Sequence, residues 1–477
     1  MLGWRRLKER SRIMNTYAVV LAAGKGTRMK SDLPKVVHEV LYKPMINLVV
    51  DELKRLGVDE IIVVVGHGAE KVEALLDDSV TIVYQREQKG TGHAVMMARD
   101  VLEGREGTTI VLNGDAPLIR SETLQGLIDF HNTHKNVGTV MSCDCDLSLA
   151  FGRIIRKAGE MQAIVEYKDL KDDMRDITEM NVGEYCFDNK ALFEALDQVT
   201  NNNAQGEYYI TDVLGILHDH GQKIDAYKIP DLSEVGGIND RVALVEATKI
   251  LQRRINKQWL LEGVTIIDPE NTYIGSDVTI GHDTIIEPGC IIKGHSKIGK
   301  NCHIGPYCEF TDVDIKDNVE IKFSVLSDSI VESGTDIGPY ARLRTNCHIR
   351  ENVHIGNFVE MKKADFGKGS KSAHLTYIGD ANVGENVNIG CGTITSNYDG
   401  KNKSLTVIKD NAFIGCNSNL VAPVTVGKDA FVAAGSTVTD DIEDGAFGIA
   451  RARQVNKDGY AKVLEEKRMK IYEERNK

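Results

Sequence analysis

The stretch YIGSDVTIGHDTIIEPGCIIKGHSKIGKNCHIGPYCEF, residues 273–310, places an aliphatic or aromatic residue at every sixth position. The residues that hold this step are Ile274, Ile280, Ile286, Ile292, Ile298, Ile304 and Phe310. After an irregular interval the step returns at Ile337, Leu343, Ile349, Ile355 and Met361, and again at Ile414, Leu420, Val426, Val432 and Val438. No α-helix or ordinary strand has a period of six, whereas a parallel β-helix points one such residue inward from each side of its coil. The pattern therefore predicts a parallel β-helix of hexapeptide repeats.

Two features of this array go beyond the period. Several of the aliphatic residues are followed directly by glycine, as in Ile280-Gly281 and Ile298-Gly299, and glycine permits a tight turn between sides. The period is also interrupted twice, by EMKKADFGKGSKSAHLTYIGD at 360–380 and by TITSNYDGKNKS at 393–404. Loops that leave a rigid solenoid are common sites of function, so we expect both interruptions to be functional.

The first half of the chain has a different pattern. Residues 17–23 (YAVVLAA) are a β-branched, apolar run typical of a buried parallel strand, and similar runs follow at 60–67, 80–85 and 108–115. Helical patterns lie between them, which predicts a Rossmann-like α/β domain with a mostly parallel sheet and ligands at the carboxyl ends of its strands. Residues 138–236 read as mixed strands that complete the pocket, and residues 238–262 as one long amphipathic helix.

Composition narrows the class of protein. A length of 477 residues favours two domains, and no window approaches 18 apolar residues, which excludes a membrane span. The net charge of −12 argues against a general nucleic-acid binder, although small anionic substrates need only a local cluster of Lys and Arg. The nine cysteines are odd in number and form no CxxC pair, which fits reduced thiols in the cytoplasm better than disulfides or a zinc site.

The sequence contains two groups of candidate site residues, one in the first half of the chain and one in the repeat array. The glycine-rich loop after the first strand could line its backbone amides against phosphates, with Arg28 and Lys35 as cations beside it. Asp115, at the end of the strand 108–115, is suited to Mg²⁺. In the array, Arg344, Lys362 and Tyr377 could bind a sugar phosphate, which leaves His374 as a general base.

These residues carry a resemblance to a known family. The motifs LAAGKGTRM, LPK, QREQKGTGHA, NGDAPLI and EVGGIND are similar to those of sugar-1-phosphate nucleotidylyltransferases. Together with ARLR, NFVEMKKA, GKGSKSAHLTY, NVNIG and SNYDG in the array, they resemble the bifunctional N-acetylglucosamine-1-phosphate uridylyltransferases and glucosamine-1-phosphate N-acetyltransferases over residues 15–455. The resemblance implies that the β-helix is left-handed.

The resemblance implies a reaction for each half. The second half would acetylate glucosamine-1-phosphate from acetyl-CoA, and the first would transfer uridylyl from UTP to N-acetylglucosamine-1-phosphate with Mg²⁺, feeding peptidoglycan and other cell-envelope synthesis. The implied segments are a disordered leader at 1–13, a nucleotidyltransferase domain at 14–237, a linker helix at 238–262, an acetyltransferase domain at 263–450 and a basic tail at 451–477. A homotrimer in the cytoplasm is implied, with no nucleic-acid or membrane partner.

Site residues follow from the same resemblance, by their positions in this sequence. In the first half, the nucleotide and sugar would be bound by Leu21, Ala22, Ala23, Gly24, Arg28, Lys35, Gln85, Gly90, Thr91, Asn113, Gly114, Asp115, Gly152, Glu166, Asn181 and Asn239, with Asp115 and Asn239 also holding Mg²⁺. In the second half, His374 would be catalytic, the sugar phosphate would contact Arg344, Lys362, Tyr377 and Asn388, and acetyl-CoA would contact Cys391, Asn397, Tyr398, Cys416, Ala434 and Arg451.

Some positions depart from the family pattern. Asn113 stands where relatives often have an aromatic residue, Cys391 and Cys416 stand where Ala and Ser are frequent, and Thr345 replaces a frequent Pro. Two other functions remain open at this point: a nucleotidylyltransferase for another sugar whose array serves assembly, and a non-enzymatic regulatory subunit. The leader reads as an upstream start or a disordered extension, with a transit peptide as the alternative, and the tail as a solvated helix or a basic arm over a phosphate-bearing ligand.

Overall fold

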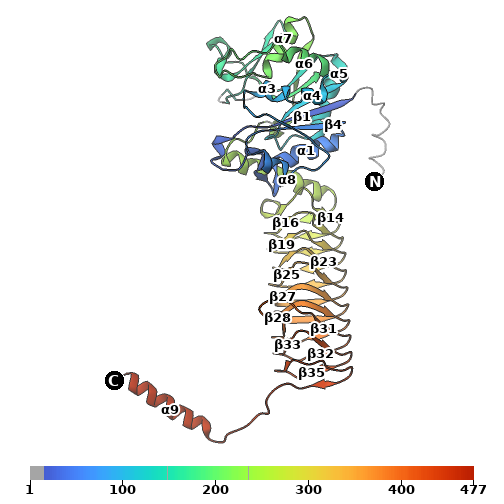
Figure 1. Ribbon diagram of the computed structural model, residues 1–477, viewed down its shortest axis with the longest axis vertical. Helices are drawn as coiled ribbons and strands as arrows, with labels where there is room; N and C mark the ends of the chain where they lie inside the picture. The colour runs from blue at the N-terminus through green and yellow to red at the C-terminus, as the bar shows by residue number, and fades with distance from the viewer. Residues whose placement is uncertain (1–14, 145, 148, 235, 477) are drawn as a thin grey trace. The chain divides into compact units, whose positions relative to one another are not determined.

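The computed structural model describes residues 15–144, 146, 147, 149–234 and 236–476, and the chain divides into two compact units (Figure 1). The first unit comprises residues up to Gln258 together with Ile274–Ser276, and the second comprises Trp259–Tyr273 and the chain from Asp277 onward. The leader predicted at residues 1–13 lies outside the described residues.

The first unit is built on a nine-stranded sheet. Its main path runs β11 (Ile224–Lys228), β7 (Gly138–Asp144), β10 (Glu179–Asp188), β6 (Thr108–Asn113), β1 (Thr16–Ala22), β4 (Glu60–Val65) and β5 (Thr81–Tyr84). Strands β1, β4, β5 and β6 are parallel, as predicted, while β10 runs antiparallel between β6 and β7. The hairpin β8 (Arg153–Lys157) and β9 (Glu160–Val165) joins the sheet through β10. The Rossmann-like α/β domain is confirmed.

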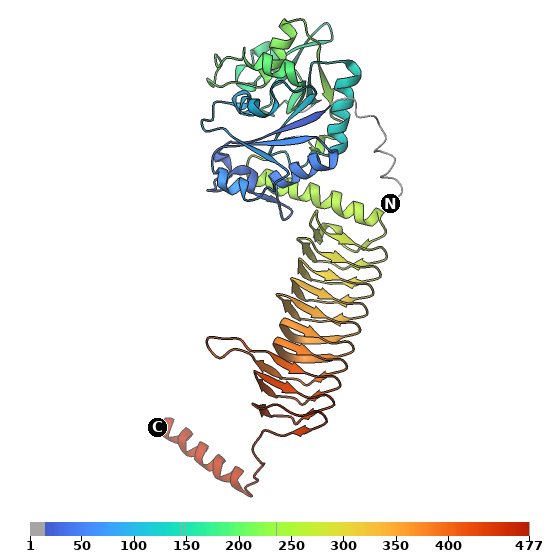
Figure 2. The ribbon, with the colours of Figure 1, turned by 45° about the vertical axis from the view of Figure 1, so that its right-hand side comes forward.

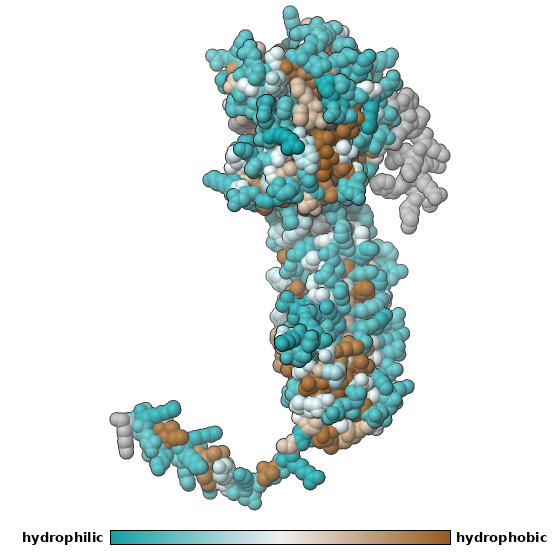
Figure 3. Space-filling model, viewed as in Figure 1, coloured by the Kyte–Doolittle hydropathy of each residue, from teal (hydrophilic) through white to brown (hydrophobic). Residues whose placement is uncertain are grey.

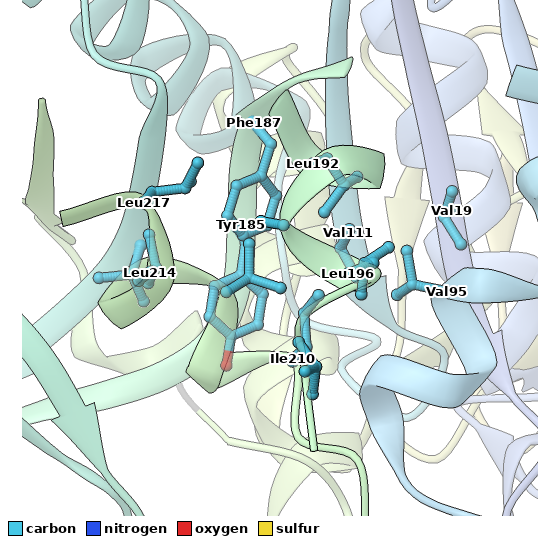
Figure 4. Close-up of a cluster of buried hydrophobic side chains, with 14 of the residues drawn as sticks. Val19, Val95, Val111, Tyr185, Phe187, Leu192, Leu196, Ile210, Leu214 and Leu217 are labelled. Atoms are coloured by element: carbon cyan, nitrogen blue, oxygen red, sulfur yellow. The ribbon is translucent and has the colours of Figure 1, made fainter. Parts of the chain in front are cut away.

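Helices cover both faces of this sheet. On one face, Val111, Tyr185 and Phe187 pack against α3 (Thr91–Met96), α6 (Asn189–Leu196) and α7 (Thr211–Asp219) (Figure 4). On the other face, Ile110 and Leu112 pack against α1 (Met45–Leu56) and α5 (Ser121–His134). Alternate residues of one strand therefore face two different cores, which explains why these strands read as continuous apolar runs. The short helices α2 (Ala69–Glu73) and α4 (Arg99–Leu102) complete the unit.

The long helix expected at 238–262 is α8 (Arg241–Leu261). Ala247 of this helix is buried, and together with Leu244 and Leu251 it packs against Met45 and Leu48 of α1. The first half of the helix is thus anchored to the first unit by its own apolar contacts.

The second unit is a left-handed β-helix of short parallel strands, from β12 (Thr265–Ile266) to β37 (Phe447–Gly448) (Figure 2). Almost every strand pairs with the one three places later, so one coil has three sides. All seventeen residues of the predicted six-residue step are buried, including Ile304 and Phe310 at the end of the first run. The apolar step therefore forms the core, as the sequence predicts.

The irregular interval of the sequence does not interrupt the coil. Ile286 pairs with Ile304, 18 positions later, whereas Phe310 pairs with Leu326, 16 positions later. Some sides of the coil are therefore shorter than six residues. The inward residues still stack on one another, although they no longer recur at every sixth position. The interruption at 360–380 is similar, because β27 (His354–Phe366) and β28 (Lys371–Val383) pair along most of their lengths and Met361 stacks under Ile378. Our expectation of a loop there is wrong: His374 lies on a strand.

The second interruption is an excursion from the coil. Ala381 pairs with Thr406, 25 positions later, so this coil holds several residues more than its neighbours. Figure 2 shows the extra residues leaving the prism as a long loop between β30 (Ile394–Ser396) and β31 (Thr406–Ile408). This loop carries Asn397 and Tyr398, as well as the lysines that follow them.

Glycine has a different role at the corners from the one expected. Gly281 and Gly299 do not adopt positive φ; instead, a Cβ on Gly281 would lie 2.6 Å from the backbone nitrogen of Lys300 in the next coil. The left-handed corners are formed by residues such as Asn301 (φ 55°) and Asn318 (φ 59°), which tolerate that conformation. Glycine after the aliphatic residue is therefore needed for the close approach of successive coils.

The chain after the last coil contains α9 (Tyr460–Arg475), which agrees with the helical pattern of the tail; all its residues are exposed. Among the described helices, none is long and apolar enough to cross a membrane. Besides Cys143, seven cysteines in the described ranges are free thiols, five of them buried.

The buried step should dominate the stability of the β-helix. Ile304→Ala removes a fully buried side chain and leaves a cavity, so we expect a loss of about 2–5 kcal/mol in the free energy of unfolding. The matched control is Ile330→Ala, at a side chain that is 38% exposed, which should cost no more than about 1 kcal/mol. Urea denaturation followed by circular dichroism measures both, and equal losses would contradict the assignment of Ile304 to the core.

Candidate functional sites

The loops after β1 and β6 meet at one edge of the sheet. The two strands are parallel neighbours, and the Gly114 amide donates a hydrogen bond to the Leu21 carbonyl at 3.0 Å. Leu21 and Ala22 end β1, while Ala23 and Gly24 begin the loop, and a Cβ on Gly24 would meet nothing within 4 Å. The first part of the glycine-rich loop therefore has free space beside its backbone.

Four predicted residues are gathered at this edge. Lys35, in the 3-10 turn η2 (Lys35–Val37), forms an ion pair with Asp115 and donates a hydrogen bond to Asn239 Oδ1 at 3.0 Å. Arg28, in the turn η1 (Thr27–Met29), donates to the same oxygen at 2.8 Å. Residues more than 200 positions apart in the sequence thus form one polar cluster.

The cluster suits a divalent cation. A carboxylate oxygen of Asp115 and the amide oxygen of Asn239 converge on the Lys35 ammonium, so a positive charge already occupies the point between them. Magnesium prefers such oxygen ligands and usually keeps several waters and substrate phosphate oxygens as well. Within the described part of the chain there is no group of three or more His, Cys, Asp or Glu that could hold a metal, so the two oxygens would be only part of its coordination shell.

Glycine at 237 keeps this carboxylate accessible. A Cβ there would lie 2.8 Å from Oδ1 and 2.9 Å from Oδ2 of Asp115. The EVGGIND motif, residues 234–240, therefore does two things: its glycine leaves room at Asp115, and its asparagine supplies the second oxygen.

The residues predicted to bind the base lie between β5 and α3. The side chain of Gln85 is buried, and its amide nitrogen donates to the Gly90 carbonyl at 3.0 Å and lies 3.0 Å from His93 Nδ1. A Cβ on Gly90 would lie 2.5 Å from the Tyr208 carbonyl oxygen, so this position has no room for a side chain. The Thr91 hydroxyl accepts from the backbone of Ile210 at 3.1 Å. These contacts order the loop, and base recognition remains a prediction.

The residues predicted to bind the sugar also come together. The Asn181 amide donates to the Gly152 carbonyl at 2.9 Å, and a Cβ on Gly152 would lie 3.5 Å from Glu166 Oε2. Burial raises the pKa of Glu166, and the Thr211 hydroxyl donates to its Oε1 at 3.1 Å. Sequence reasoning missed Thr211, because its neighbour in space lies 45 positions away in the chain.

Asn113 has a structural contact of its own. Its side-chain nitrogen donates to the Gly183 carbonyl at 3.1 Å, which ties the end of β6 to β10. Asn113, which stands in place of the expected aromatic residue, therefore makes a contact between two strands close to Asp115.

The register of the β-helix builds the second cluster. Arg344, on β25 (Arg342–Arg344), pairs with Lys362 on β27, and Lys362 pairs with Gly379 on β28. In the same strands Glu360 pairs with Tyr377, and Asn357 pairs with the exposed His374. Residues one coil apart thus project from one side of the prism, and the parallel ladder collects the predicted groups there.

A cation-rich patch lies at this side. Contact with the Lys403 ammonium lowers the pKa of Lys362, and the Arg344 guanidinium adds to the effect. Arg344 itself is bound to Glu360, with Nε 2.7 Å from Oε1. Two adjacent ammonium groups favour an anionic ligand such as a phosphate. Lys403 was missed by sequence reasoning, although its place in the lysine-rich loop could have indicated it.

The loop is held close to the coils that carry the patch. Asn397 donates a hydrogen bond from Nδ2 to the Asp380 carboxylate on β28, and Tyr398 forms a backbone bridge with Lys403. A Cβ on Gly379 would collide with both Tyr377 and Asn397, so these two side chains meet over a glycine. Asn388 begins the short strand β29 (Asn388–Ile389) on the next coil.

The positions predicted to line the acetyl donor form a column. The Asn417 amide donates to the Cys391 carbonyl at 2.7 Å, and the Gly435 amide donates to the Cys416 carbonyl at 2.8 Å. Ala434 lies beside Gly435, where a Cβ would be 3.8 Å from Cδ of Arg451. Cys391 is half-buried and Cys416 is exposed, so two small side chains stand in this column.

Comparison with family models agrees with both units. Residues 18–212 match the MobA-like NTP transferase domain, residues 255–366 match the GMPPB C-terminal domain, and residues 405–440 match the bacterial transferase hexapeptide (six repeats). The first match covers most strands of the sheet together with Lys35 and Asp115, and the last covers part of the coils with Cys416 and Ala434.

Curated relatives match almost the whole chain. The bifunctional protein GlmU of Geobacillus sp. (strain WCH70) is 54% identical, covering 95% of this chain and 99% of the relative. Proteins of the same name from Halalkalibacterium halodurans and from Listeria monocytogenes serotype 4b (strain CLIP80459) are 52% and 51% identical, each covering 94% of this chain and 98% of the relative.

Proposed function

The chain belongs to the family of the bifunctional protein GlmU, and from that premise we propose which residues serve each of its two reactions. It is a bifunctional enzyme of UDP-N-acetylglucosamine synthesis, with uridylyltransferase and acetyltransferase activities, and it uses UTP, acetyl-CoA and Mg²⁺. A role in cell-wall synthesis follows from this product. The single observation that carries the assignment of residues is the presence of two separate polar clusters, one in each unit.

Uridylyl transfer takes place in the first unit. A phosphate oxygen of N-acetylglucosamine-1-phosphate attacks the α-phosphorus of UTP, the bond to the β,γ-phosphates breaks, and pyrophosphate leaves. The reaction needs alignment and charge stabilisation rather than a protein nucleophile. Arg28 and Lys35 bind the phosphates, while Gly152, Glu166 and Asn181 hold the sugar. Gln85, Gly90 and Thr91 bind the uracil base.

The fit of a divalent ion to this cluster rests on Asp115 and Asn239, whose oxygens already share the Lys35 ammonium. Bound there, Mg²⁺ supplies charge neutralisation of the phosphates. With such an ion held by Asp115 and Asn239, Lys35 would contact the substrate phosphates. The chain thus holds the carboxylate in place before the substrate arrives.

Acetyl transfer takes place on the β-helix. Arg344, Lys362, Tyr377 and Asn388 bind the phosphate and hydroxyl groups of glucosamine-1-phosphate, and Lys403 adds a further cation. His374 takes a proton from the 2-amino group as its nitrogen attacks the thioester carbonyl, after which the carbon–sulfur bond breaks and coenzyme A leaves. Histidine suits this role because its ordinary pKa lies near neutrality. Acetyl-CoA lies along the column of Cys391, Cys416, Ala434 and Arg451, with Asn397 and Tyr398 beside both substrates.

The β-helix is also the basis for association. Hexapeptide-repeat arrays of this kind oligomerise, and we propose a homotrimer. Tyr307, Phe323, Tyr340 and Phe358 form a ladder on one corner, with ring centroids 5.5–5.9 Å apart, and all but Phe323 are more than half exposed. Figure 3 shows further apolar side chains gathered on the lower coils. Such surface is costly to leave in water and favours contact with other protomers.

The cytoplasm is the proposed location. Cytoplasmic thiols stay reduced, which agrees with the seven free thiols between Cys186 and Cys416 in the described ranges. All the proposed substrates are small molecules, and the net charge of −12 does not favour nucleic acid as a partner.

Asp115→Ala should abolish one activity and spare the other. Loss of the carboxylate removes a cation ligand, so uridylyl transfer should fall on the order of 100-fold or more, while acetyl transfer stays at the wild-type rate. Pyrophosphate release and free thiol, followed in separate assays of one preparation, measure the two activities. The control is Asp129→Ala, which removes an exposed carboxylate of α5. A parallel decline of both activities in the folded Asp115 variant would count against separate sites.

His374→Ala should have the opposite effect. Without the proton acceptor, acetyl transfer should fall by about 10²–10⁴-fold, with uridylyl transfer unchanged. His295→Ala, at another exposed histidine of the β-helix, serves as the matched control and should change neither activity. Unchanged acetylation in the His374 variant would remove this residue from the mechanism.

The trimer is tested by the mass of the protein in solution. Sedimentation equilibrium should give three times the chain mass of 52.7 kDa. Replacing Tyr307, Tyr340 and Phe358 together with serine should weaken association if the ladder lies in the contact. A monomeric mass for the wild-type protein would refute the trimer.

A further inference from the structure

The first unit contains a buried carboxylate that has no role in the reactions described above. Glu234, at the end of the 3-10 turn η5 (Leu232–Glu234), is only 1% exposed. Its Oε2 atom accepts a hydrogen bond from the Arg120 backbone amide at 3.0 Å, and its Oε1 atom accepts one from Arg120 Nε at 2.5 Å. The Thr123 hydroxyl donates to the same Oε1 at 3.0 Å. Both carboxylate oxygens are therefore held by one short stretch of chain at the start of α5.

Two arginines hold the same turn. The Arg120 guanidinium also donates to Asp231 Oδ2 at 2.9 Å. Arg254, on α8, donates to the Leu118 carbonyl and to the Ser233 hydroxyl, each at 2.6 Å. The two side chains thus tie η5 and the segment before α5 to one another and to α8.

The chain that follows Glu234 carries one of the two oxygens proposed to hold the cation. Ile238 is buried in one apolar cluster with Leu118, and its amide donates to the Asp115 carbonyl at 2.9 Å. Asn239 comes next in the chain. Glu234 and Ile238, on either side of the two glycines of the EVGGIND motif, are thus both bound to the segment that begins at Asp115.

The glycines explain why this loop needs an anchor on each side. Gly236 has a φ of 102°, which side chains disfavour, and a Cβ on Gly237 would meet the Asp115 carboxylate. Glycine loses more conformational freedom on folding than any other residue. An anchor before the glycines restricts the conformations open to them, so that Asn239 Oδ1 and the Asp115 carboxylate stay together around Lys35.

Net stability alone is a weak explanation for a buried ion pair. Taking a carboxylate out of water is costly, and its attraction to a guanidinium often does no more than offset that cost. The pair at Glu234 does fix direction, because Arg120 binds one carboxylate oxygen through its backbone and the other through its side chain. A charge-assisted contact of this kind holds the turn in one geometry.

We propose that Glu234 is a positioning residue for uridylyl transfer, which through Arg120 and Thr123 holds Asn239 within reach of Asp115. The inference rests on the proposed function of the first unit and adds to it a residue that acts through its neighbours rather than on the substrate. Such outer partners orient the groups that bind a metal, and their loss commonly weakens metal affinity by about 10–100-fold.

The experiment observes the loop and the ion separately, in the full-length protein without nucleotide. Glu234→Gln replaces one carboxylate oxygen with an NH₂ group, which cannot accept a hydrogen bond from Arg120 or Thr123. We expect the amides at 236–239 to exchange faster with deuterium in the metal-free variant, as measured by mass spectrometry. Mn²⁺ binding, followed by electron paramagnetic resonance, should weaken about tenfold.

Kinetics distinguish positioning from a general defect. In Glu234→Gln the Mg²⁺ concentration that gives half-maximal pyrophosphate release should rise about tenfold. The value of kcat at saturating Mg²⁺ should stay near that of the wild type, because the bound ion then holds Asn239 in place. Acetyl transfer by the same preparation should be unchanged, which reports that the chain is folded.

Two further variants provide controls. Glu60→Gln is matched to the test variant, because Glu60 also binds an arginine and a threonine, Arg105 and Thr81, but at the opposite end of the parallel strands. It should leave Mn²⁺ affinity and the exchange of the loop unchanged. Thr123→Val removes one donor to Glu234 and keeps the ion pair, so it should weaken Mn²⁺ binding by about threefold even if the glutamine variant does not fold.

The outcomes are distinguishable. Wild-type Mn²⁺ affinity in both Glu234→Gln and Thr123→Val, whatever their melting temperatures, would overturn the positioning role and leave the uridylyl-transfer site intact. An equal loss of affinity in Glu60→Gln would also overturn it, because the effect would then be one of general stability. If the wild-type protein itself shows neither saturable Mn²⁺ binding nor Mg²⁺-dependent pyrophosphate release, the proposed function of the first unit fails instead.

Discussion

Backbone pairing between successive coils is the constraint on which the second unit depends. Each parallel ladder fixes which residue stands above which, so one apolar column fills the core and the neighbouring positions form columns on the surface. Arg344 stands over Lys362, and Lys362 over Gly379, because the strands that carry them are bonded in that register. A shift of a single residue would turn the inward side chains outward and scatter the cationic patch.

The same principle acts at a different scale in the first unit. Strands β1 and β6 lie side by side and parallel, so the loops that follow them leave at one edge of the sheet. The loop after β1 supplies Arg28 and Lys35, the turn after β6 supplies Asp115, and the segment before α8 supplies Asn239. The two sites therefore arise from one rule, in which parallel neighbours bring sequence-distant side chains together at a common edge or side.

Both sites carry charge that the rest of the unit does not compensate fully. In the β-helix, two lysines lie close enough to lower the pKa of one of them, which is unfavourable until an anion is bound. In the sheet, Asp115 depends on Lys35, and buried carboxyl groups at Glu166 and Glu184 have raised pKa values. Such uncompensated charge is typical of binding sites, because the ligand provides what the fold leaves unpaired.

The sequence by itself determined the two architectures and the family, and it pointed to the residues from which both proposed sites are built. A period of six fits a parallel β-helix and neither an α-helix nor an ordinary strand, and the motifs around Lys35, Asp115 and His374 stand in contiguous stretches. It could not show that the chain at 360–380 continues as strands where the six-residue period is lost. A coil of 17 residues still stacks Met361 on Ile378, although its inward residues no longer recur every sixth position. Nor could it reveal the contact of Thr211 with Glu166 or that of Lys403 with Lys362, because these partners lie far apart in the chain. Only the tertiary structure decided these, since pairing, burial and the approach of like charges are properties of the folded backbone.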